Sequence, residues 1–477
     1  MILTEEDSEG RSWDFLLLRD GFHAYSTTSS GSWSNMSYRS FLDATSRTFL
    51  PAGFPDSVRP EYLAYQFWDS LQALCSYLRS VLTIQAVLTS AGVGNSEASA
   101  LSTTLTWVIK DGMGMIGSLL FAYRFADVFE VNVKEWRLVA DILNNFALTV
   151  DLFLPLYPDY YLILTCVSSM CKSCCGLVSG ATRARISAHF AQKGHLADVT
   201  AKESTQETAV TLIGLIIGFI CTKYIGDSSE VAWILFFVLM TIHQIANYKL
   251  IRTLVLDTLN PQRVYLMVHY IEVLLQMEGT VITNGSSSSS SSKDPVAATV
   301  MLTIPTPEIV ADNESIYRPI WLYFYGPQHA VSLSTLLKAI HMTPKTLNDA
   351  YIALRNAWIG QEFIIAVDSR GRPITCLYKN CNEEGSIKAY AISCYFMHRW
   401  SVEKVTSNIS KINYILNGGA IYGLKWYAKQ VHNRGLKKFG WDVDDGSTTL
   451  GGNGARIVAD GYGCSYSYRE SNNNKSR

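Results

Sequence analysis

The chain has 477 residues, of which 48% are hydrophobic and 17% are charged, and its formal net charge at pH 7 is -1. The net charge is close to zero, and the sequence has no stripe rich in Lys and Arg that would attract phosphates. Both observations argue against a nucleic-acid partner. Ten cysteines follow no regular framework spacing, so we expect no disulfide scaffold. The length predicts two or three domains.

Residues 1–45 are predicted to form an irregular N-terminal arm, because the segment is rich in serine from Ser26 to Ser40. The acidic start of the chain argues against a secretory signal or an organellar transit peptide. A helical domain is predicted over residues 46–278. Its first helix is expected to begin at Pro60 and Glu61, since proline suits the first helical position and an acid suits the first turn.

Three further apolar runs, over residues 107–125, 136–156 and 160–178, are long enough to cross or nearly cross a bilayer, yet they carry ionisable side chains. A charged side chain in lipid costs several kcal/mol unless it is paired or hydrated. Ion pairs such as Lys110 with Asp141, or Asp111 with Arg137, would neutralise these charges, and a solvated helix face would hydrate them. The alternative is a polar interior that binds a small charged solute. The candidate residues for that interior are Lys110, Asp111, Asp141, Asp151 and Arg183.

Two apolar runs separated by a short acidic turn follow, over residues 209–225 and 231–247. As a helix, each run with its flanks covers about 25–30 Å, which is close to the thickness of a hydrocarbon core. The outer flanks are basic, and the positive-inside rule places such flanks in the cytosol. A membrane hairpin is therefore predicted, and a buried hairpin in a large soluble core is the alternative.

Two short motifs resemble known cofactor or metal sites. Gly112-Met-Gly-Met-Ile-Gly117 matches the dinucleotide-binding string, but that string needs a preceding strand and a βαβ unit, and glycines serve equally well for close packing of helices. Cys171-Lys-Ser-Cys174-Cys175 has the spacing of half a zinc site, but no second pair of ligands lies near it in sequence. We therefore predict no cofactor and no metal.

A run of serines, Ser286–Ser292, predicts a flexible linker over residues 279–315. Residues 316–441 are predicted to form a small soluble α+β domain, and the tail over 442–477, rich in Gly, Ser and Asn, is expected to be disordered. Helices are expected at Ser332–Ile340, Lys345–Trp358 and Ile421–Asn433, and short strands at Glu362–Val367, Ile374–Tyr378 and Ile387–Ile392. The predicted fold class is thus mainly α: a polytopic helical membrane bundle followed by a small soluble α+β C-terminal domain.

Several colinear strings resemble the root UVB sensitive family. They are Phe49–Val58, Tyr65–Gln72, Trp107–Gly117, Trp136–Asn144, Gly180–Ala184 and Ala197–Thr208. The resemblance is close over residues 46–265 and looser as far as Trp441. It implies a membrane-associated protein that is linked to vitamin B6 homeostasis. It implies no catalytic residues, because none is established for the family, and it implies pyridoxal phosphate only as a ligand.

Two functions are consistent with these features. The first is a membrane protein that binds or moves a small charged solute. The second is a membrane-anchored adaptor that recruits a partner protein through its C-terminal domain. An enzyme is not expected, because no lysine is set among backbone donors that would hold a phosphate. We expect a lipid membrane as the location, with the C-terminal domain in the cytosol.

Overall fold

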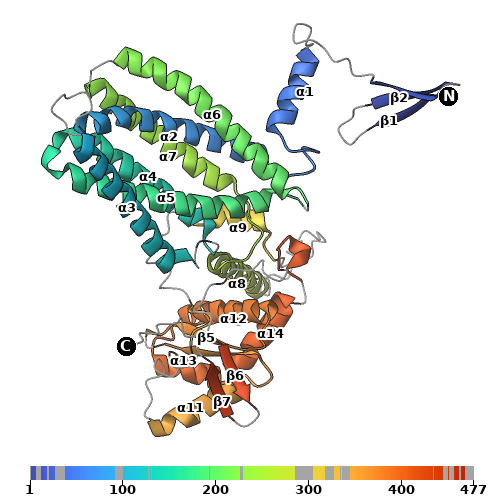
Figure 1. Ribbon diagram of the computed structural model, residues 1–477. Coiled ribbons are helices and arrows are strands. Elements are labelled where there is room, and N and C mark those ends of the chain that lie inside the picture. Colours follow the sequence, from blue (N-terminus) through green and yellow to red (C-terminus); the bar gives the residue numbers. More distant parts are fainter. Residues whose placement is uncertain are drawn as a thin grey trace. The chain divides into compact units, whose positions relative to one another are not determined.

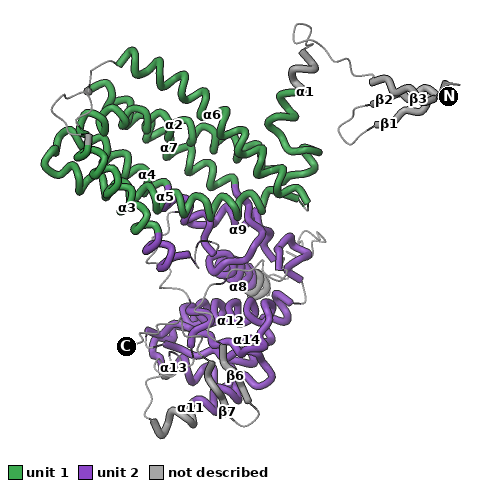
Figure 2. Tube along the Cα trace, viewed as in Figure 1, with its two compact units in different colours: residues 1–118, 141–253 green, residues 119–140, 254–477 purple. Residues whose placement is uncertain are grey.

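The computed structural model is mostly helical and forms two compact units, which Figure 2 shows in different colours. Unit 1 comprises residues 1–118 and 141–253, and unit 2 comprises residues 119–140 and 254–477. The residues that the structure describes are 2–6, 12–18, 21–26, 38–91, 100–126, 129, 131–192, 194–225, 229–284, 304–316, 327–332, 335, 344–368, 370–432, 435–443, 450, 456–460 and 463–467.

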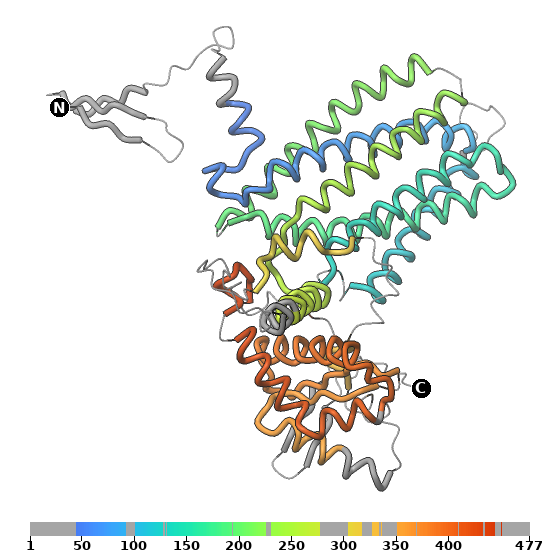
Figure 3. Tube along the Cα trace, turned by 180° about the vertical axis from the view of Figure 1, so that it is seen from behind, coloured from blue at the N-terminus to red at the C-terminus, as the bar shows by residue number. Residues whose placement is uncertain are grey.

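Unit 1 is built from long helices, and α3 and α4 also contribute residues to unit 2. Helix α2 lies beside both α6 and α7 (Figures 1 and 3). A Cβ on Gly214 of α6 would lie 2.7 Å from the Tyr77 ring of α2, so the small residue permits this close approach. The helices are α1 Tyr38–Phe49, α2 Tyr62–Ser90, α3 Ala100–Phe125, α4 Val133–Phe153, α5 Tyr161–Phe190, α6 Leu196–Ile225 and α7 Ser229–Thr253, with 3-10 turns at Leu154–Leu156 and Pro158–Tyr160.

Six helical segments of the described residues are long and apolar enough to cross a membrane by length and composition. They are Tyr62–Ser90, Leu101–Phe125, Val133–Leu156, Pro158–Phe190, Leu196–Ile225 and Glu230–Thr253. The predicted runs 209–225 and 231–247 are confirmed as two consecutive helices, α6 and α7. The three earlier runs are also helical, and α5 extends to Phe190, well beyond its predicted end.

The first 45 residues contain regular structure that was not predicted. Strands β1 Ile2–Glu6, β2 Ser12–Leu18 and β3 Gly21–Ser26 form an antiparallel sheet in the order β1-β2-β3. The prediction of an irregular arm gave weight to serine, whereas these strands hold aromatic and other apolar residues that favour strands. Most of the serine-rich stretch, residues 27–37, lies outside the described residues.

Unit 2 combines helices with a four-stranded sheet of order β4-β5-β6-β7, in which β5 and β6 are parallel and the other neighbours are antiparallel. The predicted strands at 362–367 and 374–378 and the helices at 345–358 and 421–433 are confirmed with small shifts at their ends. The elements are α8 Pro261–Asn284, α9 Pro307–Asn313, α11 Pro344–Ala357, β4 Phe363–Val367, β5 Pro373–Tyr378, α12 Glu383–Val402, α13 Asn408–Tyr414, α14 Ala420–Gln430, β6 Arg456–Asp460 and β7 Gly463–Ser467, with a π-helical turn at Ile415–Gly419 and a 3-10 turn at Lys437–Phe439.

The strand predicted at Ile387–Ile392 is wrong, because these residues lie in the middle of helix α12. The side chain of Asn382 accepts a hydrogen bond from Gly385 N at 2.8 Å, which caps the helix. Glu383 and Glu384 then occupy the first turn, where acids interact favourably with the helix dipole. The buried positions of α12 are consecutive from Ala389 to Phe396. Alternation of apolar and polar residues therefore does not distinguish a strand from a helix in this segment.

Three other predictions near the linker and the tail have mixed outcomes. The serine run lies outside the described residues, as does most of the helix expected at 332–340. Helix α9 falls inside the predicted linker and is partly buried. Strands β6 and β7 fall inside the tail that was expected to be disordered. The β6 sequence Arg-Ile-Val-Ala-Asp contains the β-branched residues Ile and Val, which favour a strand. The prediction of disorder used the overall Gly- and Ser-rich composition of the tail and missed this short segment.

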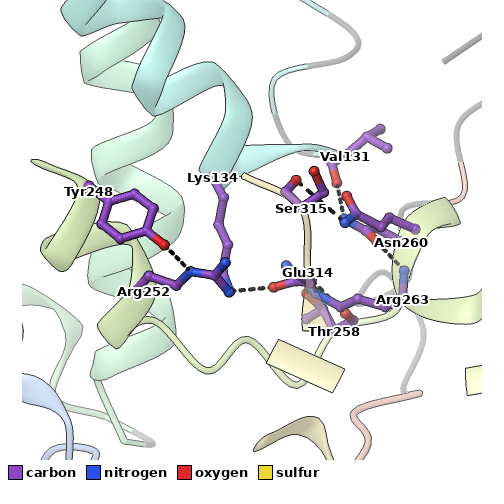
Figure 4. Close-up of polar contacts among 10 residues, drawn as sticks. Val131, Lys134, Tyr248, Arg252, Thr258, Asn260, Arg263, Glu314 and Ser315 are labelled. Carbon is purple, nitrogen blue, oxygen red and sulfur yellow. Dashed lines mark hydrogen bonds and ion pairs between the residues drawn. The ribbon is translucent and has the colours of Figure 1, made fainter. Parts of the chain in front are cut away.

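Glu314 forms a buried ion triad within unit 2. Its Oε1 accepts a hydrogen bond from Arg263 Nε at 2.5 Å, and its Oε2 pairs with Lys134 Nζ (Figure 4). All three side chains are at most 5% exposed. Asn260 reinforces the site, since its Oδ1 caps α8 by accepting from Arg263 N at 2.8 Å and its Nδ2 donates to Val131 O at 3.1 Å. The triad thereby ties residues 131–134 to α8 and to the chain after α9.

The core of unit 2 includes α8, which the sequence assigned to the helical domain. Leu259, Val264, Met267, Val268 and Ile271 are at most 1% exposed and belong to the same apolar cluster as β4, β5 and α12. The compact units therefore differ from the predicted domains 46–278 and 316–441.

We expect a fragment that carries residues 254–477 together with residues 119–140, joined by a short linker, to unfold cooperatively, and a fragment of residues 316–441 not to fold. Losing one buried apolar side chain costs about 2–5 kcal/mol, and a whole domain is stable by only about 5–15 kcal/mol. Removing the buried face of α8 therefore exceeds what the shorter fragment can tolerate. Thermal melts followed by circular dichroism test this. A cooperative transition in residues 316–441 at the temperature of the longer fragment would contradict it.

Candidate functional site

Buried polar side chains gather inside the helices of unit 1. Six residues on three helices, which we call the polar file, are at most 7% exposed. Within each helix their spacing of four or seven residues places them on one face. They are Gln72 and Arg79 of α2, Asp141 and Asn145 of α4, and His243 and Asn247 of α7.

A carboxylate, an amide and an imidazole meet in the middle of the polar file. Gln72 Nε2 donates to Asp141 Oδ1 at 2.8 Å and lies 3.2 Å from His243 Nε2. His243 Nε2 is 3.9 Å from the same Asp141 oxygen. Because the amide nitrogen is a donor only, this arrangement assigns the acceptor role to His243 Nε2. Asp141 and His243 can each hold a proton within this closed interior, and the Gln72 amide contacts both of them.

Arg79 lies at one end of the polar file. Its Nη1 donates to Asn145 Oδ1 at 2.5 Å, and its guanidinium carbon is 5.9 Å from the centroid of the Phe236 ring. Its Nε and Nη2 atoms have no hydrogen-bond partner among the described residues, and the same holds for both amide atoms of Asn247 at the other end. Buried polar atoms in proteins are nearly always hydrogen-bonded, so these atoms mark places where a solute or water would bind.

The pairings also give the order of the groups along the bundle. Gln72 meets His243 while Arg79 meets Phe236, so α2 and α7 run antiparallel. Gln72 meets Asp141 and Arg79 meets Asn145, so α2 and α4 run parallel. Asn144 Nδ2 donates to Ser76 Oγ at 3.0 Å between these two levels. At 1.5 Å per residue the file from Asn247 to Arg79 is about 16 Å long, roughly half of a hydrocarbon core.

The outer faces of unit 1 are apolar. Phe219 of α6 is 72% exposed and Met115 of α3 is 66% exposed, whereas Arg79 and His243 are fully buried. Other exposed apolar side chains are Leu101, Leu105, Val108, Ile116, Leu212, Ile213, Leu215, Ile216, Ile234 and Ile245. Water-soluble monomers rarely expose contiguous apolar surface of this kind, so the polarity of unit 1 is inverted relative to a soluble bundle.

The five candidate residues from the sequence do not converge on one interior, which corrects that expectation. Lys110 Nζ pairs with Asp111 at 3.4 Å, so the predicted pairs Lys110–Asp141 and Asp111–Arg137 are wrong. Asp151 forms an ion pair with Lys172, and Arg183 forms a half-exposed pair with Glu207 at 2.6 Å. Among the five, only Asp141 belongs to the polar file.

The sequence analysis missed the other members of the polar file. Arg79 was a visible signal, because it is the one basic residue of helix α2 and lies seven residues after Gln72. His243 and Asn247 are polar residues four apart near the end of the second hairpin run. Their partners lie between 66 and 171 residues away in sequence, so spacing within one helix does not reveal the set.

The glycine string Gly112–Gly117 lies within helix α3, and the described residues directly before it, from Ala100 onward, are helical. A Cβ on Gly114 would lie 2.7 Å from the hydroxyls of Ser169 and Ser173 of α5, and one on Gly117 would lie 3.0 Å from Met170. The glycines therefore serve close packing of α3 against α5, and the dinucleotide hypothesis loses its structural setting.

Comparison with known proteins finds one family, by a family model and by individual relatives. Residues 35–273 match the model of the vitamin B6 photo-protection and homoeostasis domain. The chain is 41% identical over 233 residues to RUS family member 1 of Dictyostelium discoideum, which covers 48% of this chain and 44% of that protein. It is 36% identical over 265 residues to root UVB sensitive 3 of Arabidopsis thaliana, covering 54% and 60%.

A third relative is the chloroplastic root UVB sensitive 2 of Arabidopsis thaliana, at 32% identity over 220 residues, covering 46% of this chain and 50% of that protein. The chain thus spans about half the length of the curated relatives it matches. No solved structure matches it.

Proposed function

The chain belongs to the root UVB sensitive family, and from that premise we propose that it is a membrane protein that binds or moves a small charged solute through the polar file of unit 1. The observation that supports this proposal most directly is the inverted polarity of the unit, with charged and amide side chains inside and apolar side chains outside. Ionisable residues within membrane helices usually mark the path of a substrate, an ion or a proton.

The arrangement of the six apolar segments supports a membrane topology. An even number of crossings puts both ends of the bundle on the same side of the bilayer. Basic residues such as Arg185 precede α6, and Lys249 and Arg252 end α7, whereas Glu230 lies in the first turn of α7 and Asp227 comes between the two helices in sequence. Under the positive-inside rule the ends of the bundle, and with them residues 254–477, face the cytosol.

Alkaline carbonate is therefore expected to leave the protein in the membrane pellet. Peripheral proteins are released by this wash, whereas helices that bury apolar side chains in lipid are retained. The measurement is an immunoblot of pellet and supernatant, with a known peripheral protein of the same membrane as the control. If most of the chain moved to the supernatant, the membrane proposal and the solute pathway would both fail.

The solute is proposed to belong to the vitamin B6 group, because the matching domain is named for its role in vitamin B6 homoeostasis. Titration calorimetry of the purified chain in detergent with pyridoxal, pyridoxine, pyridoxamine and their phosphates tests this directly. We expect at least one vitamer to bind with a stoichiometry near one. Absence of binding by every vitamer to folded protein would reject the vitamin B6 assignment.

A second candidate function is an adaptor that recruits a partner protein through unit 2. A cavity of about 470 Å³ between α12 and α14 favours it, and an ion pair between Glu384 and His432 at 3.1 Å lies at its edge. The two functions separate in a rescue assay. Recruitment predicts that His432→Ala and Glu384→Ala abolish rescue while substitutions in the polar file do not, and solute binding predicts the reverse.

A further inference from the structure

The guanidinium of Arg79 has one edge in use and one edge free of partners. Nη1 is engaged by Asn145, and the Nε and Nη2 atoms have no hydrogen-bond partner among the described residues. The side chain is 0% exposed, and the negative charge of Asp141 attracts it from beyond ion-pair distance. A buried guanidinium whose charge is only partly compensated and whose donors lack acceptors is costly unless another group satisfies it.

The surroundings of Arg79 make that cost larger. Leu82, Leu148, Leu152 and Phe236 belong to the apolar cluster at this level of unit 1, and each is buried. In such a medium the attraction between opposite charges is much stronger than in water. The same apolar walls offer few other acceptors to the free donors.

The free edge has a specific chemical shape. The Nε–H and Nη2–H bonds of arginine point in parallel, and their separation matches the two oxygens of a carboxylate or a phosphate. We propose that the Nε and Nη2 atoms of Arg79 bind an oxyanion, a carboxylate or a phosphate group, of the solute that enters the polar file. This inference rests on the proposed function and names the chemical class of its substrate.

The position of Arg79 assigns different tasks to the two ends of the polar file. Measured along the helices, the level of Asp141 and His243 lies about 6–10 Å from the level of Arg79, a distance suited to a small molecule with an anionic group at one end. Asn145 fixes the guanidinium through Nη1, so that the free edge keeps its direction when the solute is absent. Arg79→Lys retains the charge but cannot present two parallel donors.

The test measures the melting temperature of the full chain in detergent, by tryptophan fluorescence, in sodium chloride, phosphate and acetate at equal ionic strength. We expect phosphate or acetate to raise the melting temperature of the wild type by about 2–4 °C relative to chloride near saturation. The gain should disappear in Arg79→Lys and Arg79→Gln. It should persist in Arg252→Gln, a control at an exposed arginine of α7 that contacts Tyr248.

A second arm separates a dissolved anion from a lipid head group. The same proteins are melted in nanodiscs of phosphatidylcholine with and without phosphatidylglycerol. A gain that needs the anionic lipid and depends on Arg79 assigns the oxyanion to lipid, and a gain from phosphate or acetate assigns it to a soluble molecule.

The proposal is overturned if the wild type gains nothing in any arm, or if Arg79→Lys and Arg79→Gln keep the full gain. The wild-type arms decide it even where a variant does not fold. Calorimetry with the B6 vitamers on the same preparations distinguishes a failure of the Arg79 proposal from a failure of the proposed function. Vitamer binding without any anion effect would overturn the role of Arg79 alone, and loss of both would overturn the proposed function as well.

Discussion

Glu314→Gln is expected to lower the free energy of unfolding of unit 2 by about 3–5 kcal/mol, the cost of removing one partner from a buried ion pair. The carboxylate lies between Arg263 and Lys134, and all three side chains are at most 5% exposed. Glutamine has a similar shape but leaves two buried cations without a counter-charge. Chemical denaturation followed by circular dichroism measures the change, and exposed Glu308→Gln on α9 is the matched control.

The same carboxylate makes stability depend on pH. Burial alone would raise the pKa of Glu314, but the positive charges of Arg263 and Lys134 and their hydrogen bonds outweigh it and hold the pKa below its ordinary value. The stabilisation is therefore complete above the unfolded pKa of about 4.3 and is lost as the pH falls through the lower folded pKa. The acid loss should be smaller in Glu314→Gln. Equal stability of the two proteins at neutral pH would show that the triad contributes nothing.

Asp141→Asn is expected to abolish rescue in cells that lack the endogenous protein, while the melting temperature changes little. Asparagine keeps an oxygen that accepts from Gln72, so the hydrogen bond of 2.8 Å can persist. It removes the negative charge next to His243 Nε2, however, and with it any exchange of a proton or a cationic solute at this level. Growth rescue and the melting temperature in detergent are measured on the same variant.

Asp111→Asn is the matched control for Asp141→Asn, because Asp111 lies in a neighbouring helix but its side chain is 60% exposed. Its loss should leave rescue intact. Full rescue by Asp141→Asn at normal protein level would mean that the polar file does not carry the function. The adaptor function through unit 2 would then be favoured.

The sequence predicted the long helices well because their signal is local. The runs that form α6 and α7 are uninterrupted and apolar, and no alternative element of that length suits them. The error at Ile387–Ile392 has a physical reason. Helix α12 is buried over consecutive residues, so it is rich in apolar residues on all sides, and a short stretch of it resembles the alternating pattern of a strand. The cap at Asn382 was the more reliable signal, since a side chain that caps a helix has a specific geometric role.

The candidate site was predicted only in outline. Polar residues inside apolar helices predicted a polar interior, and buried polar side chains do lie in unit 1, but four of the five chosen residues are paired elsewhere. Whether two such residues meet depends on which helices pack together and in which direction. Gln72 and His243 are 171 residues apart and meet only because α2 and α7 pack antiparallel. No periodicity within one helix encodes that pairing.

The ion triad has a consequence for the time course of synthesis. Lys134 is translated 180 residues before Glu314, which corresponds to a delay of about 10–40 s at ordinary elongation rates. For most of that interval the segment 119–140 is already synthesised while its counterparts in residues 254–477 are not, and Glu314 is added only at its end. The nascent chain must therefore keep this segment hydrated or held by a chaperone, and a ribosome that stalls between α7 and α9 would leave its lysine without the acid that completes the fold.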